Sequence, residues 1–193
     1  VKQLGTHLAK TMNLKEYMEL MEKSELELFD KVTSFLNKEN QKCIYYLIDL
    51  GSGDGLKGEV FIQKIGESKI KAYFPVDIQP IELSYVLTNH KENNYATHPV
   101  LLDFEKLSTR FPLKVLPKEK QIYAFLGGTY GNFPSDKMNS YLKAVYEDNS
   151  AILIISMPLR VSEKEILRSY AGINFEEIAF APLKHVGFKK SDF

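Results

Sequence analysis

This sequence has one cysteine and no net charge, and each of these features argues against certain classes of function. Cys43 is the one cysteine among 193 residues, so neither an internal disulfide nor a site of several thiolates can form. This usage fits a reducing compartment, and we expect the cytoplasm. The 25 basic and 25 acidic residues cancel, so no overall field attracts nucleic acid. A small molecule is the expected partner, and nucleic acid is not expected.

Long apolar runs and familiar catalytic motifs are also missing. The longest runs, Ile44 to Leu50 and Ala151 to Ser156, are far shorter than the roughly 18 to 20 residues that span a bilayer. No membrane partner is therefore expected. The histidines are His7, His90, His98 and His185. Their spacing does not match a metal site, so no metal is predicted. Neither a G-x-S-x-G elbow nor a Walker lysine loop is present.

What the sequence does contain, from residue 44 onward, is an alternation of short apolar runs with amphipathic segments. The runs are mostly β-branched or aromatic and too short for helices, which predicts strands. The predicted strands are Ile44 to Leu50, Ile70 to Val76, Thr97 to Leu102, Gln121 to Leu126 and Ala151 to Ser156. The predicted helices between them are Leu56 to Ile65, Pro80 to Thr88, and Ser135 to about Asp148. This alternation predicts an α/β fold with a mostly parallel, doubly wound sheet.

A helical segment is predicted before the sheet, in residues 1–40, with the main domain in residues 41–193. Asn13 is placed to cap one helix and Ser24, with Glu27 three residues later, to cap a second. We expect this segment to form a packing layer or lid, and a substrate-binding role is the alternative. Another capping pair, Ser162 with Glu165, predicts a late helix. A sheet of this kind commonly has one or two further strands, so residues are expected to be missing at the C-terminal end.

The loop after the first predicted strand reads DLGSGDGLKG, from Asp49 to Gly58. It fits both a dinucleotide turn and the D-x-G-x-G-x-G turn that holds S-adenosylmethionine. A dinucleotide turn would begin at Gly51 and need a small residue at its sixth position, which is Leu56. The register therefore favours S-adenosylmethionine, and an NAD-dependent oxidoreductase stays the alternative.

Acidic residues follow the next two predicted strands. Asp77 is placed to accept hydrogen bonds from both ribose hydroxyls of an adenosine, which S-adenosylmethionine and NAD share. Asp103 suits the exocyclic amine of adenine, and Phe104 suits its face. Each aspartate could instead cap the helix that follows it. Ligand binding is favoured for Asp77, while position alone does not decide between the roles of Asp103.

A fourth loop, Phe125 to Phe133, has three glycines within five residues. So much glycine costs chain entropy, which is understandable where backbone wraps closely round a ligand. Tyr130 adds an aromatic wall, and Asn132 adds an amide that can both donate and accept hydrogen bonds. A plain tight turn is the alternative. The pattern favours a ligand site.

Taken together, the four loops resemble those of the histidine-specific, S-adenosylmethionine-dependent methyltransferases, the family that makes trimethylhistidine for ergothioneine. The matching segments are Leu50-Gly-Ser-Gly53 with Lys57, Pro75-Val-Asp-Ile78, Asp103-Phe104, and Phe125 to Asn132, where Gly128 stands in place of a serine. The similarity covers roughly residues 44–172. It implies a Rossmann-like class I methyltransferase fold and N-methylation of a small, histidine-like amine.

The resemblance also implies roles for single residues. It implies that the cofactor is held by Gly51, Lys57, Asp77, Asp103 and Phe104. The further predicted cofactor-binding residues, from the loops themselves, are Asp49, Ser52, Gly53, Gly127 and Gly128. Asn132 and Tyr130 are the predicted catalytic residues, and Asn132 and Tyr170 the predicted substrate contacts. A non-catalytic domain that binds an adenosine cofactor stays a third hypothesis. The oligomeric state is not predicted.

Overall fold

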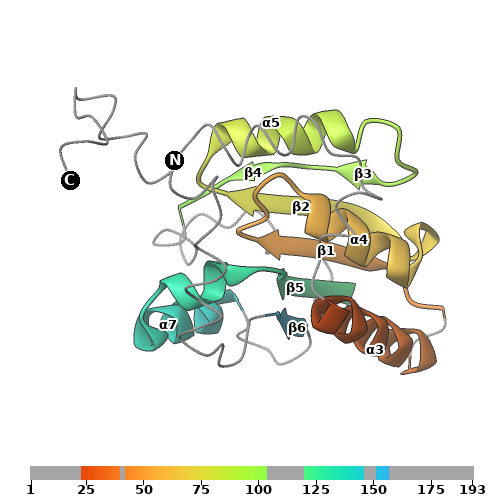
Figure 1. The fold of residues 1–193 in the computed structure, drawn as a ribbon, viewed down its shortest axis with the longest axis horizontal. Coiled ribbons are helices and arrows are strands. Elements are labelled where there is room, and N and C mark those ends of the chain that lie inside the picture. Colours follow the sequence, from red (N-terminus) through yellow and green to blue (C-terminus); the bar gives the residue numbers. More distant parts are fainter. Residues whose placement is uncertain (1–22, 40–41, 104–119, 146–150, 157–193) are drawn as a thin grey trace, which may run out of the picture. The chain divides into compact units, whose positions relative to one another are not determined.

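Strand β1 (Tyr45–Leu50) lies inside a parallel sheet, between β2 (Ile70–Asp77) and β5 (Gln121–Phe125). The computed structural model describes residues 23–39, 42–103, 120–145 and 151–156. Within them the strand order is β3-β2-β1-β5-β6, and β4 also pairs with β2 (Figure 1). The remaining strands are β3 (Ala96–Thr97), β4 (Val100–Leu101) and β6 (Ile152–Ile155). Every pairing is parallel.

The direction of winding reverses between β1 and β5. From β1 the chain steps through α4 (Leu56–Ile65) and η1 (Glu67–Lys69) to β2, and through α5 (Pro80–Asn89) to β3 and β4. It then continues on the other side of β1, with β5 and β6. At such a reversal the loops that leave the carboxyl ends of the two strands open a crevice, which is where ligands bind in these sheets.

Both faces of the sheet are covered, because residues within each strand alternate between two apolar clusters. One cluster contains Leu47 of β1 together with Phe29 of α3 (Lys23–Glu39) and Phe61 of α4. Phe29 and Phe61 meet edge to face, with ring centroids 5.5 Å apart. The other cluster contains Ile48 of β1 and Met138 of α7 (Ser135–Val145). The doubly wound parallel sheet expected from the sequence is therefore confirmed.

The prediction of a single strand from Thr97 to Leu102 is wrong. Two short strands, β3 and β4, occupy this stretch, and they are separated by His98 and Pro99. The amide of His98 still donates to the carbonyl of Tyr73, at 2.8 Å. Pro99 has no amide hydrogen, so it cannot donate to the ladder and the pairing breaks there.

The helical preface is described only in part. Helix α3 begins at Lys23, so Ser24 lies inside the helix and the prediction of Ser24 as its cap is wrong. The predicted helices after Asn13 and Ser162 lie outside the described residues. All described residues belong to one unit of the chain, residues 12–157. The predicted domain boundary at residue 40 stays a prediction. No helix among the described segments is long and apolar enough to cross a bilayer.

Candidate functional site

The first loop, Asp49 to Gly58, is hydrogen-bonded to the end of strand β2. The amides of Gly51 and Ser52 both donate to the carbonyl of Val76, at 2.8 and 3.1 Å. The amide of Gly53 donates to Oδ2 of Asp77, at 3.0 Å. These bonds hold the glycine turn beside the loop that follows β2. The two predicted binding loops are therefore adjacent in the folded chain.

Asp77 combines a structural contact with spare capacity for a ligand. Its Oδ1 accepts from the amide of Gln79, at 2.9 Å, just before helix α5, while Oδ2 holds Gly53. Each carboxylate oxygen has a further lone pair, so bonds to ribose hydroxyls remain possible. The amide of Leu102 donates to the carbonyl of Asp77, at 3.0 Å, which places Asp103 at the next strand end. The capping and ligand-binding interpretations of Asp77 are thus compatible.

Ser52 has a buried hydroxyl group in the first loop. Its Oγ is buried, and no residue within the described ranges forms a hydrogen bond with it. A buried hydroxyl without a partner costs free energy, so native proteins rarely leave one unsatisfied. A polar ligand group in the crevice would supply the missing bond. The residues present therefore fit a polar cofactor.

The fourth loop lies beside the first, at the carboxyl end of β5. Its residues Gly128–Asn132 make a short 3-10 turn, η5. Thr129 Oγ1 lies 3.4 Å from the carbonyl oxygen of Gly51, to which it donates. Tyr130 packs its ring edge to face against Phe125, with centroids 5.5 Å apart. Asn132 is exposed. The loops at the reversal point are therefore in direct contact.

Lys57, in the first turn of α4, also reaches toward the fourth loop. Its Nζ donates to Oε1 of Glu25 in helix α3, at 2.6 Å. The hydroxyl of Ser156, which follows β6, donates to the same oxygen at 3.3 Å. A Cβ atom on Gly127 would lie 3.9 Å from Lys57 Nζ. Sequence reasoning missed Glu25, because an acid in the first turn of a helix is explained by the helix dipole alone.

Asp49 lies below helix α4 and is only 2 % exposed. Its Oδ2 accepts a hydrogen bond from the hydroxyl of Tyr73, at 2.8 Å, and burial raises the pKa of Asp49 to about 7. A Cβ on Gly58 would lie 2.8 Å from Asp49 Oδ2, so the helix passes directly over the carboxyl group. Contact between Asp49 and a cofactor stays a prediction, which this burial disfavours.

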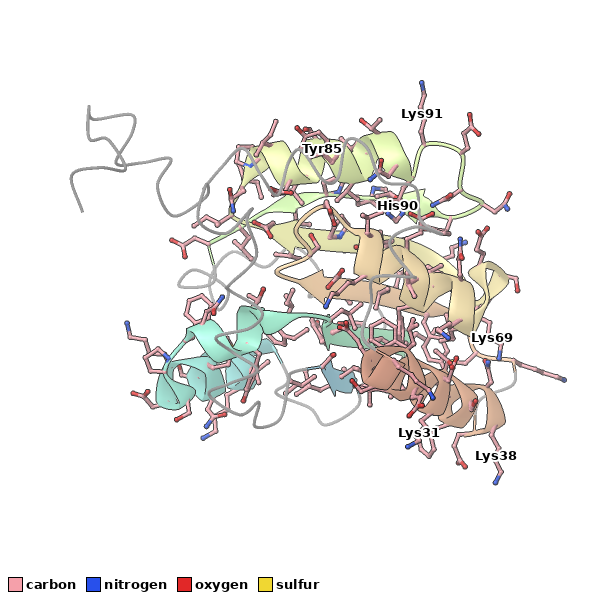
Figure 2. The ribbon with its side chains drawn as sticks, in the orientation of Figure 1. Lys31, Lys38, Lys69, Tyr85, His90 and Lys91 are labelled. Atoms are coloured by element: carbon pink, nitrogen blue, oxygen red, sulfur yellow. The ribbon has the colours of Figure 1, made fainter. Side chains whose placement is uncertain are left out.

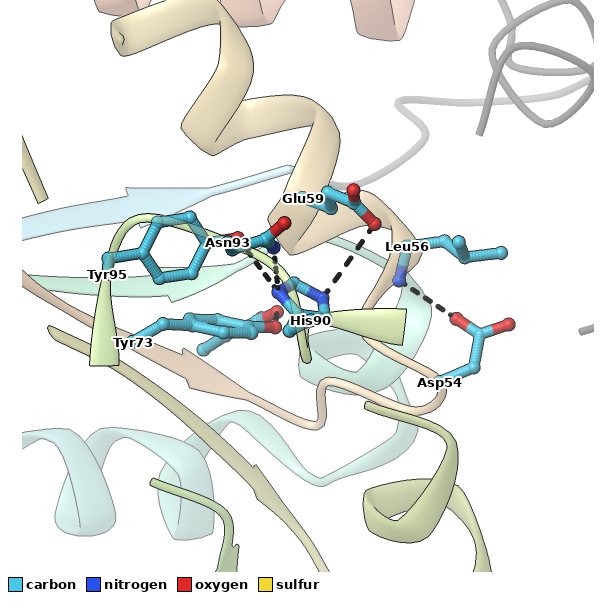
Figure 3. Close-up of polar contacts among 8 residues, drawn as sticks. Asp54, Leu56, Glu59, Tyr73, His90, Asn93 and Tyr95 are labelled. Carbon is cyan, nitrogen blue, oxygen red and sulfur yellow. Dashed lines mark hydrogen bonds and ion pairs between the residues drawn. The ribbon is translucent and has the colours of Figure 1, made fainter. Parts of the chain in front are cut away.

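His90 supports the first loop from the side of helix α5. Figure 2 contrasts it, inside the fold, with its neighbour Lys91, which projects outward. His90 Nδ1 is 2.8 Å from the hydroxyl of Tyr95, and the rings of His90 and Tyr73 stack with centroids 5.1 Å apart (Figure 3). A Cβ on Gly55 would lie 3.3 Å from His90 Nε2. The ring therefore packs against Gly55, the residue that precedes α4.

A charged pair between His90 and Glu59 is suggested by distance but opposed by burial. His90 Nε2 and Glu59 Oε2 are 3.9 Å apart. Burial lowers the pKa of His90 to about 4 and raises the pKa of Glu59. The imidazole is then neutral at neutral pH, and the contact is not an ion pair. We assign this cluster a packing role behind the loop.

The predicted site residues thus divide into three groups. The first is gathered at the carboxyl edge of the sheet: Gly51, Ser52, Gly53, Lys57, Asp77, Asp103, Gly127, Gly128, Tyr130 and Asn132. Asp49 is buried beneath that edge. Phe104 and Tyr170 lie outside the described residues. Across the described segments, no three His, Cys, Asp or Glu side chains are grouped as metal ligands.

This topology, with glycine-lined loops at the reversal and aspartates at the neighbouring strand ends, defines a Rossmann-like domain that binds a nucleoside cofactor. The particular cofactor follows from comparison with known families. The model of the histidine-specific, S-adenosylmethionine-dependent methyltransferases matches residues 5–180. The chain belongs to this family, and S-adenosylmethionine is its cofactor. The resemblance found in the sequence is confirmed.

Solved structures show a looser similarity. A candidate S-adenosyl-L-methionine-dependent methyltransferase from Methanococcus maripaludis is 12% identical, with a TM-score of 0.48 over 92% of this chain and 84% of that one. A SAM-dependent methyltransferase from Aquifex aeolicus is 18% identical, with a TM-score of 0.41 over 93% and 90% of the two chains. None of the curated proteins matches.

Proposed function

We propose that this methyltransferase methylates an amine nitrogen of an amino acid or similar small molecule, with a histidine-like acceptor as the first candidate. One observation carries the proposal. The first loop, held by Asp77 and in contact with Thr129, lies at the carboxyl edge of the sheet, beside the loop that carries the exposed Asn132. The family match supports a histidine-like acceptor.

The cofactor half of the crevice supplies binding groups. When bound, S-adenosylmethionine supplies an electrophilic methyl group on a sulfonium. The N-H groups in the first turn of α4, which follows Gly55, suit a carboxylate. Asp77 would accept hydrogen bonds from the ribose hydroxyls, and Asp103 would accept one from the adenine amine. These contacts would fix the orientation of the nucleoside.

The acceptor half needs mainly to position an uncharged nitrogen. Such a nitrogen attacks without a dedicated base when it is held about 3 Å from the methyl group and in line with the breaking bond. The amide oxygen of Asn132 would accept a hydrogen bond from the amine and direct its lone pair. Gly127 and Gly128, which carry no side chains, would leave a channel for the methyl group, and Tyr130 would form its wall.

The cofactor preference gives the first test. A ligand at 100 times its Kd stabilises a protein by about 2.7 kcal/mol, which is roughly 5 to 10 °C in Tm for a chain of this size. We expect that shift with S-adenosylmethionine and S-adenosylhomocysteine, and none with NAD or ATP, in a thermal denaturation assay. A shift with NAD alone would favour the oxidoreductase hypothesis and end this proposal.

The acceptor role of Asn132 gives the second test. Asn132→Ala should lower kcat about 100-fold, because the amine loses its orienting partner, and should change the Kd for S-adenosylhomocysteine less than twofold. Transfer of a labelled methyl group to histidine and other amines measures kcat, and calorimetry measures Kd. Asn139→Ala, at an exposed position on α7, is the control. Unchanged turnover in Asn132→Ala would remove this residue from the mechanism.

If the cofactor binds but no amine accepts the labelled methyl group, the third hypothesis gains support. A non-catalytic domain would bind S-adenosylmethionine with the same stabilisation and release no methylated product. The two measurements therefore separate all three functions, because the thermal assay reports the cofactor and the labelling assay reports transfer.

A further inference from the structure

The pair formed by Glu25 and Lys57 lies beside the fourth loop, at the carboxyl edge of the sheet. The contact of 2.6 Å joins helices α3 and α4, and the two side chains are 16% and 31% exposed. Ser156, at the carboxyl end of β6, holds the same glutamate oxygen at 3.3 Å. Gly127 borders the pair on the side of the fourth loop. Four segments of the chain thus place one negative and one positive group at the predicted cofactor site.

Stability does not account for this arrangement. Partly exposed ion pairs contribute little to folding, since side-chain entropy and solvent screening offset the attraction. The two helices are also joined without it, because Lys64 of α4 bonds to Asp30 of α3 and Phe29 packs on Phe61. The arrangement of the pair is therefore better explained by a ligand that needs both charges.

We propose that Glu25 and Lys57 together bind the α-amino-acid end of the cofactor, with Glu25 taking the ammonium and Lys57 the carboxylate. This inference deepens the proposed function and rests on it. An α-amino acid has its ammonium and carboxylate on one carbon atom, so a complementary site needs both signs of charge close together. Glu25 and Lys57 provide that arrangement before any ligand is bound.

The hydrogen-bonding capacity of the pair matches this ligand. The ammonium of Lys57 has three donors, and Glu25 occupies one of them. The described residues bond to Glu25 only through Oε1, which leaves Oε2 able to accept from a ligand ammonium. Ser156 keeps the glutamate in place. Bound ligand and protein would form an alternating square of four charges, in which each group stays paired.

Two ligands separate the two roles. S-adenosylhomocysteine has both charged groups, and its desamino analogue lacks only the ammonium. Glu25→Gln should raise the Kd for S-adenosylhomocysteine about 10- to 100-fold, which is the effect of losing one charged hydrogen bond. The Kd for the analogue should change less than twofold. Lys57→Gln should raise the Kd for both ligands by a similar factor. Calorimetry on the purified chain measures each Kd.

Glu27→Gln is the matched control, because Glu27 lies on the same helix but is 57% exposed and pairs with Lys23. It should bind both ligands as the unaltered chain does. The inference is overturned if Glu25→Gln changes the Kd for S-adenosylhomocysteine less than twofold. It is also overturned if the variant raises the Kd for both ligands equally or lowers the Kd for either. If the unaltered chain binds neither ligand, the proposed function itself fails, and that result is recognised before any variant is made.

Discussion

Gly51→Ala is expected to lower the free energy of unfolding by about 3 to 4 kcal/mol and to abolish cofactor binding. Gly51 has φ +74°, in the left-handed region that costs other residues about 1 to 2 kcal/mol. An added Cβ would lie 2.4 to 2.7 Å from three side-chain atoms of Thr129. The methyl group would therefore push apart the two loops that form the crevice.

Gly53→Ala is a control that introduces the backbone strain of a positive φ without a contact with Thr129. Gly53 also has a positive φ, +55°, but an added Cβ there would meet nothing within 4 Å. It should cost only about 1 to 2 kcal/mol. Urea denaturation measures both variants, and the double variant Gly51→Ala, Thr129→Gly should recover part of the loss. Equal destabilisation by the two alanines would show that the loops are not in contact as described.

Helix α4 shows how much of the fold was readable. Its predicted range, Leu56 to Ile65, is the observed one, because a glycine with positive φ stands immediately before it and another immediately after it. The strands were predicted to within about a residue wherever apolar side chains occupy both faces. The break at Pro99 was missed, since a proline in an apolar run reduces pairing without removing the strand pattern.

The sequence predicted those parts of the candidate site whose positions follow from the sheet topology. Parallel strands bring their carboxyl ends to one edge, so Gly51, Asp77 and Asp103 had to lie together once the strands were identified. Glu25 could not be found in this way. It is 32 residues from Lys57 and 131 from Ser156 in sequence. Which face of α3 meets the sheet decides its position, and local spacing gives no information on that.

Gly58→Ala should destabilise the protein by about 2 to 4 kcal/mol, although alanine is the better helix former. In helix α4 the change would gain about 1 kcal/mol of helix propensity. Against this, an added Cβ would lie 2.3 Å from the Tyr73 hydroxyl oxygen and 2.8 Å from Asp49 Oδ2. Tyr73 is fully buried and cannot move aside, so the helix must shift or the Tyr73–Asp49 bond must break.

Overpacking outweighs propensity here, and a double-mutant cycle can show it. Tyr73→Phe removes the nearest atom, so the double variant with Gly58→Ala should lose less stability than the two single variants together. Gln63→Ala, at an exposed position on the same helix, should be neutral or slightly stabilising. Urea denaturation of all four variants measures the coupling. If the two losses simply add, α4 does not rest on the buried tyrosine. If they couple, that contact also fixes Lys57, one residue before Gly58, at the crevice.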